Sequence, residues 1–361
     1  PDFKLPQVWK NTLAADFKLP LPFNTEMTIE GIYAKNLNAV IQQNVNVIPL
    51  SDSKMKRFAG PDNRYLYPGS TESRIYKDMS GAYMLTNTTK GYSYSLNASL
   101  RMNPIENLNA MLSYTYTGSK EVSGNPGAQP NELWQNVPTV NGGNYMELTN
   151  SQYLTPHKVI ASLSYRIPYA KNFATSVSLF YSGYNAGNFS YMYDGDMNQD
   201  GINNDLIYIP KSKDELTFVD KNGFTAEQQA EAFWNYVNQD SYLKNHKGEY
   251  AKAYSARYPW VNQIDLKVVQ DFIVKAGKTT NTLQVSLDIF NLGNLLKDTW
   301  GVTKVPVNSG RILKYEGVTA DNVPTFSMYQ SENKLPSETF SYLKNSSNCW
   351  QIQVGIRYIF N

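Results

Sequence analysis

The sequence predicts an all-β protein, a transmembrane antiparallel β-barrel, and three observations support this prediction. Apolar and polar residues alternate over nine stretches of about nine to fourteen residues, which is close to the length that a tilted strand needs to cross a bilayer. The connections between these stretches alternate between tight turns and long excursions. Tyrosine is abundant, with 27 residues in a chain of 361, and tyrosine favours the boundary between membrane and water.

The last stretch shows the alternation most clearly. Even positions from 350 to 360 are apolar, whereas the odd positions from 351 to 357 are Gln351, Gln353, Gly355 and Arg357. Successive strand side chains point to opposite faces, so this stretch has one apolar and one largely polar face. The same pattern occurs at residues 92–100, 108–116, 159–167, 177–181, 264–268 and 283–289, and two less regular candidates lie at residues 9–19 and 27–33.

Connections between these strands differ in length in a regular way. Tight turns rich in Pro, Gly, Asn and Lys lie at residues 20–25, 103–107, 169–172 and 276–280. Long excursions occupy residues 42–80, 121–154, 188–257 and 297–346. This alternation predicts short periplasmic turns and long extracellular loops.

Nine strands would leave two unpaired edges in lipid, which the absence of water makes very unfavourable. The chain starts at Pro1 without a signal peptide, and its first residues already have strand character. We therefore expect residues 1–361 to be the C-terminal part of an outer-membrane β-barrel domain, with earlier strands in the intact protein. The first of the nine strands runs toward a short periplasmic turn, and the last ends at the C-terminus. An odd number of strands with these directions fits the final nine strands of a barrel that has an even number in total.

A soluble β-sandwich is the main alternative, because its strands also alternate apolar and polar residues. Soluble strands are usually about five or six residues long, which is shorter than these stretches. The polar face is rich in Ser, Thr, Asn and Gln, and aromatic residues lie near the strand ends, which favours the barrel. A bundle of transmembrane helices is excluded, since the sequence has no run of eighteen apolar residues and its mean hydropathy is −0.47.

Charge and residue counts exclude several functions. The 33 basic and 31 acidic residues are scattered and give a net charge of +2, so we expect no nucleic-acid partner. One cysteine, Cys349, and two histidines, His157 and His246, are too few for a zinc site or a disulfide framework. No catalytic motif surrounds either histidine, so we predict that the protein is not an enzyme. Cys349 is expected to be an idle thiol in the last strand or in the loop before it.

A candidate calcium loop lies in the longest excursion. Asp196, Asn198 and Asp200 alternate and precede a glycine, as in the first half of an EF-hand loop. Position twelve of such a loop would be isoleucine, so Asp194 and Asp205 would have to complete the ligand shell. The alternative is a solvated turn rich in Asp, Asn and Gly. Calcium here would be structural, and no other cofactor is expected.

A short helix is predicted in the same excursion. Thr225 and Gln228 form the pattern of a capping box, and apolar residues follow at helical spacing as far as about residue 238. We interpret this helix as a packing element that covers the mouth of the barrel, with direct contact to a ligand as the alternative.

The C-terminal segment and several loop motifs resemble a known family. Gln353, Gly355, Tyr358 and Phe360 resemble the signal that the barrel-assembly machinery recognises, although Asn361 follows the last aromatic residue. Other segments resemble Oar-like TonB-dependent outer-membrane receptors in order along the chain, at residues 194–210, 234, 239–243, 259–260, 265–266, 270–272 and 290–296.

This resemblance implies a barrel of 22 strands with an N-terminal plug, of which the present strands would be the last nine. It implies a multi-pass location in the outer membrane of a Gram-negative bacterium and energy from the inner-membrane TonB complex. The function implied is transport of a large or scarce substrate. The alternative is a passive porin, or a structural barrel that binds a partner through its loops. Expected partners are the TonB complex, the barrel-assembly machinery, the lipid bilayer and an unknown substrate.

Overall fold

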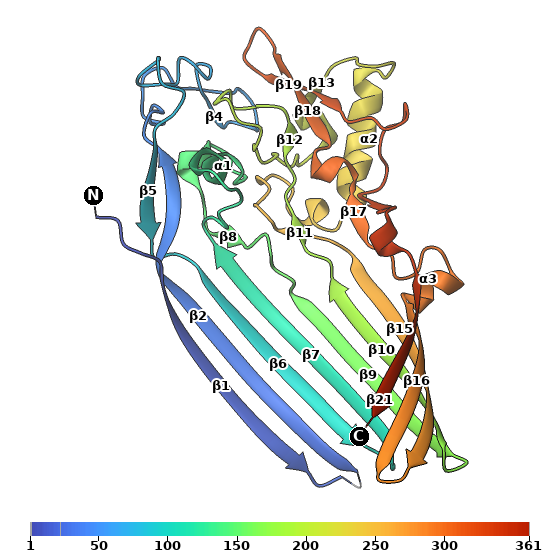
Figure 1. Cartoon of the computed structure of the whole chain (residues 1–361). Helices are drawn as coiled ribbons and strands as arrows, with labels where there is room; N and C mark the ends of the chain where they lie inside the picture. Colours follow the sequence, from blue (N-terminus) through green and yellow to red (C-terminus); the bar gives the residue numbers. More distant parts are fainter. Residues whose placement is uncertain (1, 22, 361) are drawn as a thin grey trace.

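The computed structural model describes residues 2–21 and 23–360, so Asn361 lies outside the described residues. One long antiparallel sheet forms the lower part of the molecule, and the long connections gather at its upper end (Figure 1). Nine strands follow one another in the sheet in the order of the sequence. They are β1 (Gln7–Leu19), β2 (Asn24–Asn44), β6 (Tyr92–Asn103), β7 (Leu108–Glu121), β9 (His157–Tyr169), β10 (Phe173–Asn185), β15 (Trp260–Ala276), β16 (Thr279–Phe290) and β21 (Gln351–Phe360).

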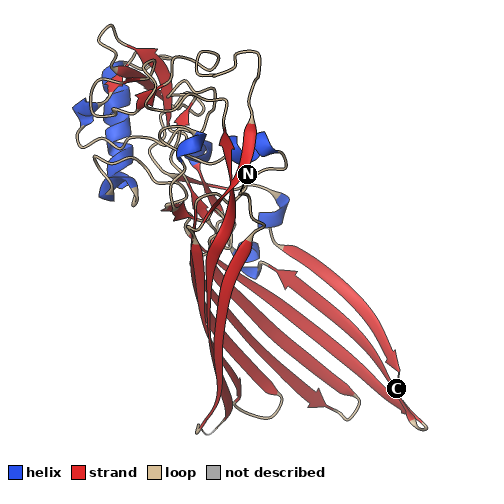
Figure 2. Ribbon diagram, turned by 90° about the vertical axis from the view of Figure 1, so that its left-hand side faces the viewer, coloured by secondary structure: helices blue, strands red, loops and turns tan. Residues whose placement is uncertain are grey.

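All nine predicted strands are present, and most are longer than the alternation suggested. Strand β2 has 21 residues because it continues above β6 into the loop region, where it pairs with β5. Strand β15 has 17 because it pairs with β10 as far up as Trp260 and with β16 as far down as Ala276. Strands β5 (Tyr83–Thr88) and β8 (Thr149–Asn150) pair with β2 and β7 beside the main path. Figure 2 shows the strands curving together as a bent sheet. In the described residues the sheet does not close, since β1 and β21 each pair along one edge.

The register places one apolar face across the whole sheet. Leu163 of β9 lies opposite Leu179 of β10, which lies opposite Leu266 of β15, and this row continues through Ile289 of β16 to Ile352 of β21. Neighbouring rows on the same face have the same character. Because side chains alternate between faces along every strand, the serine-rich and charged positions share the opposite face. We call these the outer face and the inner face.

The four long connections, residues 45–91, 122–156, 186–259 and 291–350, fold together into what we call the cap. A mixed sheet of β12 (Tyr193–Asp194), β18 (Leu313–Val318), β19 (Pro324–Met328) and β13 (Thr217–Phe218) lies at its centre, in that order. The cap also contains three separate two-stranded sheets: β3 (Lys56–Arg57) with β4 (Tyr65–Leu66), β11 (Asn188–Phe189) with β14 (Ala256–Arg257), and β17 (Lys304–Pro306) with β20 (Phe340–Tyr342).

Three α-helices lie in the cap: α1 (Pro130–Gln135), α2 (Ala226–Gln239) and α3 (Leu292–Leu296). Helix α2 is the predicted helix, and both capping-box hydrogen bonds between Thr225 and Gln228 are formed. It buries Phe233, Tyr236 and Val237 and packs against β13 and β19. No helix within residues 2–21 and 23–360 is both long and apolar enough to cross a membrane.

Candidate functional site

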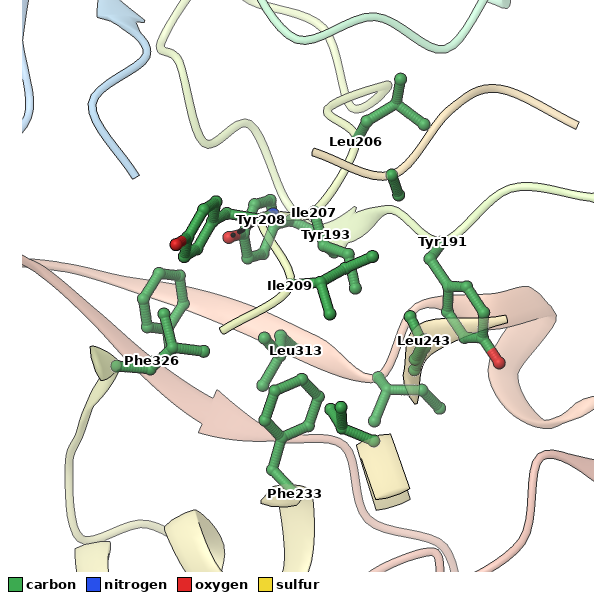
Figure 3. Packing of buried hydrophobic residues seen from close by; sticks show 14 of the residues in the cluster. Tyr191, Tyr193, Leu206, Ile207, Tyr208, Ile209, Phe233, Leu243, Leu313 and Phe326 are labelled. Atoms are coloured by element: carbon green, nitrogen blue, oxygen red, sulfur yellow. Dashed lines mark hydrogen bonds between the residues drawn. The ribbon is translucent and has the colours of Figure 1, made fainter. Parts of the chain in front are cut away.

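The cap has a hydrophobic core of its own, drawn from segments far apart in the sequence (Figure 3). Phe58, Tyr193, Phe233 and Phe326 come from three of the connections, and each is at most 3% exposed. Tyr193 and Phe326 stack with ring centroids 5.3 Å apart. Since burial of apolar surface is the main favourable term in folding, this core holds the connections together as one folded unit.

An arginine lies buried in the cap between two carboxylates. Arg64 donates through Nε and Nη2 to the two oxygens of Asp62, at 2.9 and 3.0 Å, and through Nη2 to the carbonyl of Leu206 at 2.7 Å. Its Nη1 lies 3.4 Å from Oδ1 of Asp205. Burial alone would lower the pKa of Arg64, but Asp62, Tyr193 and Asp205 outweigh it and raise the pKa. This ionic group links the first connection to the third.

The predicted calcium residues fall into a self-bonded turn. Asp196 accepts from the backbone N–H groups of Asp200 and Gly201, at 3.1 and 2.8 Å. Asn198 accepts from the N–H of Asp200 at 2.9 Å, and Asp205 accepts from the N–H of Met197 at 2.8 Å. The turn therefore brings Asp196, Asn198, Asp200 and Asp205 together.

The fifth predicted ligand, Asp194, lies in β12, in backbone register with Lys314 of β18. Burial raises the pKa values of Asp196 and Asp200, and it raises that of Asp205 to about 7. Carboxylate and amide oxygens suit calcium. Yet among the described residues no group of three or more His, Cys, Asp or Glu side chains has the geometry of a metal site. Calcium binding here stays a prediction.

A cavity of about 740 Å³ opens in the cap beside this turn. Its wall includes Asn44, Arg74, Asn131 and Asp200, together with Tyr83 and Trp134, whose ring centroids are 5.7 Å apart. Amide, guanidinium and carboxylate groups beside aromatic rings can bind a polar ligand by hydrogen bonds and stacking. The sequence did not indicate this cavity, because its residues come from four separate segments without any motif.

The cap also packs against the inner face of the sheet. At the top of β15 the inner-face residue Val261 is 3% exposed, whereas its outer-face neighbour Trp260 is 39% exposed. Lower on the inner face, Asp271 accepts hydrogen bonds from Arg166 and Gln284, and Lys267 pairs with Asp288 at 2.6 Å. The sequence analysis described the polar face as rich in Ser, Thr, Asn and Gln and did not identify these two ion pairs, although each of the four charged residues has inner-face parity.

Aromatic side chains mark both ends of the outer face. Near the tight turns, Phe173 packs against Tyr169 and Phe272 with centroid distances of 5.9 and 5.7 Å. Near the cap, Tyr116 lies 5.1 Å from the ring of His157 and 5.7 Å from Tyr94. Rings at two levels with aliphatic rows between them match the aromatic girdles of an outer-membrane barrel. His157 is the first residue of β9, at the start of a strand as predicted.

The predicted assembly signal forms the edge strand β21. Tyr358 and Phe360 are exposed on the outer face with ring centroids 6.2 Å apart. Gln353 lies opposite Asp288 and Gly355 opposite Ser286 of β16, while the other edge of β21 has no partner strand in the described residues. Exposed Cys349 lies in the loop just before this strand, which was one of its two predicted positions.

Comparison with known protein families matches residues 2–310 to the family described as "Outer membrane beta barrel domain". The chain belongs to this family. The protein is therefore an outer-membrane barrel protein of a Gram-negative bacterium, which agrees with the two faces of its sheet. Searches of curated proteins and of solved structures found no match.

Proposed function

We propose that this chain is the C-terminal part of the barrel of a TonB-dependent outer-membrane receptor of the Oar-like branch. Such a protein would move a large or scarce substrate across the outer membrane with energy from the inner membrane. The loop motifs at residues 194–210 and 290–296 support the choice of branch. Family membership supports the barrel. The packed cap supports the proposal that transport requires energy.

The packed cap is the observation on which the proposal depends most. A passive porin needs a lumen that stays open, with loops that leave a continuous path for water. Here four connections share one hydrophobic core and a buried Arg64. Opening such a unit would break buried contacts rather than displace separate flexible loops. Passage of a large solute past the cap would therefore require energy, which the TonB complex would supply.

The two free edges of the sheet support the proposal of a larger barrel. Strands β1 and β21 each present unpaired backbone N–H and C=O groups along one edge in the described residues, and such groups are very unfavourable in lipid. We propose that further strands of the same protein pair with both edges and close a barrel of 22 strands around a plug. A transport role, rather than catalysis, is part of this proposal.

The edge of β21 also suggests how the barrel-assembly machinery would bind. An extended strand with a free edge can pair with the edge of another sheet, and its side chains then give specificity. Tyr358 and Phe360 lie on the outer face beside that edge. We propose that the machinery binds this edge and these two rings before the barrel closes.

Two measurements on the full-length protein test the proposed function. In a planar bilayer bathed in potassium chloride, the protein should show no steady conductance, because the cap and plug obstruct the lumen. The purified protein should also bind the periplasmic C-terminal domain of TonB. A steady ohmic conductance without any energy source, together with no binding of TonB, would favour the passive porin instead.

A further inference from the structure

A second cavity, of about 380 Å³, opens beside the top of β15. Strand β16 ends at Phe290, whereas β15 continues upward to Trp260, so the edge of β15 is left uncovered above that point. The chain turns away into α3 and returns along residues 299–304, and the cavity lies between this segment and β15. Figure 1 shows α3 projecting sideways from the top of β16.

This cavity lies at the uncovered edge of β15 and is lined mainly by outer-face residues of that strand. Its wall includes Trp260, Asn262 and Ile264, which are alternate outer-face residues of β15, and one inner-face residue, Val261, at the uncovered edge of the strand. Ile264 lies opposite Tyr181 in the apolar rows. The cavity is therefore continuous with the surface that contacts lipid.

Its height corresponds to the outer boundary of the membrane. Phe272 belongs to the lower aromatic girdle, and Trp260 is twelve residues further along β15. At about 3.3 Å per residue and a tilt of about 45°, these positions differ in height by about 28 Å. The apolar band of such barrels is about 25 Å tall, so Trp260 lies where the acyl chains of the outer leaflet meet their headgroups.

The chemistry of the cavity changes from apolar to cationic. Trp300 is 55% exposed and Tyr342 is 40% exposed, and both line the wall together with Lys304. The Lys304 Nζ lies 4.7 Å from the Tyr342 ring centroid, and the Lys297 Nζ lies 5.8 Å from that of Trp300. Neither lysine takes part in an ion pair among the described residues, although Asp298 is exposed next to Lys297.

The far wall of the cavity is firmly held. The Asn291 side chain donates to the carbonyls of Gly301 and Asn348, at 3.1 and 3.2 Å, and its backbone N–H donates to Asp265 at 2.8 Å. Gly301 has a φ of 64°, and a Cβ there would lie 1.9 Å from the Asn291 side-chain oxygen. Residue 301 must therefore be glycine for the wall to approach so closely. The cavity is thus a formed feature rather than a gap beneath a loose loop.

We propose that this cavity binds a lipid of the outer leaflet that has a phosphorylated headgroup. An acyl chain would lie along Ile264 and Trp260, and the phosphate would contact Lys304, with Lys297 at the rim. Aromatic rings at the boundary and lysines just above it are the groups that such an amphiphile requires. The site goes beyond transport and depends only on the outer face of the sheet contacting lipid.

Lipid binding to the full-length protein tests this proposal. The protein is purified from outer membranes, stripped of lipid in detergent, and titrated with lipid A or with dephosphorylated lipid A, while native mass spectrometry counts bound lipid. The wild type should bind lipid A more tightly. Replacing Lys297 and Lys304 together by glutamine should remove that preference, because each lysine is expected to increase the affinity for lipid A about fivefold. Lys244→Gln, an exposed lysine of the cap, should leave it unchanged.

A second pair of variants tests the apolar part of the site. Trp300→Ala should weaken binding of both lipids. Trp9→Ala, which removes an exposed tryptophan of β1 that does not line the cavity, should not. Equal affinity of the wild type for the two lipids would overturn the proposal. It would also be overturned if the double lysine variant kept the preference, or if inorganic phosphate alone displaced lipid A at a similar concentration.

Discussion

Replacing Arg64 with methionine leaves Asp62 and Asp205 buried in the cap without the cation that they share. Both carboxylates and the guanidinium are at most 1% exposed, so water cannot replace the lost bonds. Removing one partner of a buried ion pair typically costs about 3–5 kcal/mol. At about pH 8, where Asp205 as well as Asp62 is ionised, we expect the free energy of opening of the cap to fall by about that amount, while the barrel strands stay folded.

Hydrogen exchange of the full-length protein in detergent measures this effect. A loss of about 3–5 kcal/mol corresponds to two to four orders of magnitude in the protection of cap amides. Arg57→Met is the matched control, because Arg57 lies in the same connection and is exposed, and it should change the opening free energy by less than about 1 kcal/mol. The combined variant Asp62→Asn, Arg64→Met and Asp205→Asn should lose less than Arg64→Met alone, because no charge remains buried and the amide oxygens can still accept from Tyr193 and Met197.

Equal protection in Arg64→Met and Arg57→Met would refute this reasoning. It would mean that the buried ionic group does not hold the first connection to the third. A loss of protection that extended to β7 and β9 would refute a different part, namely that the cap unfolds as a unit separate from the sheet.

Three further predictions concern the outer face, the assembly signal and the acidic turn. Leu112→Arg places a charge on the lipid-facing side of β7 and should lower the unfolding free energy in vesicles by about 2–4 kcal/mol; Ser113→Arg, on the inner face, should have little effect. Phe360→Ala should lower the fraction of newly made protein that reaches the folded, heat-modifiable form in cells. Burial raises the pKa of Asp205 from 3.8 to about 7, so the folded cap is more stable when this carboxyl is protonated. With calcium removed by a chelator, raising the pH from about 4 to 7 should therefore destabilise the cap by up to about 4 kcal/mol. Adding calcium should then slow hydrogen exchange in residues 194–205, most strongly at the higher pH.

Asp205 has a higher pKa in the folded state than in the unfolded state, so folding takes up a proton as the pH rises above about 4. The folded state holds a proton on Asp205 between pH 4 and 7, whereas the unfolded state has lost it. The stabilisation is therefore complete below pH 4 and disappears as the pH rises through the folded pKa. Asp205→Asn should reduce this slope, and the part that remains is expected from Asp196 and Asp200, whose pKa values are also raised by burial. An unchanged slope in that variant would assign the pH dependence to other groups.

The strands could be predicted from the sequence because alternation is a local property. Residues 92–100 or 283–289 show their two faces without reference to any other segment, and lipid contact makes the apolar face uninterrupted. The capping box at Thr225 was equally local, and helix α2 begins there. Turn residues similarly fixed the ends of the strands.

The cap could not be predicted in the same way. Tyr193 and Phe326 stack on each other although 133 residues separate them, and Arg64 lies in a loop with no periodicity to indicate that it is buried. Neither cavity has a motif, since each wall combines single residues from distant segments. The two charged pairs of the inner face depend on strand register, which alternation alone does not give.

Spin labels on β7 test the central claim, that one face of the sheet contacts hydrocarbon and the other water. Cys349 is first replaced by serine, and single cysteines are then placed in the full-length protein at Leu112, Ser113, Tyr114 and Thr115 for labelling in vesicles. Labels at 112 and 114 should be relaxed mainly by oxygen, which dissolves in the bilayer. Labels at 113 and 115 should be relaxed mainly by a water-soluble nickel complex. Access of the nickel complex to all four positions would contradict the membrane-spanning sheet.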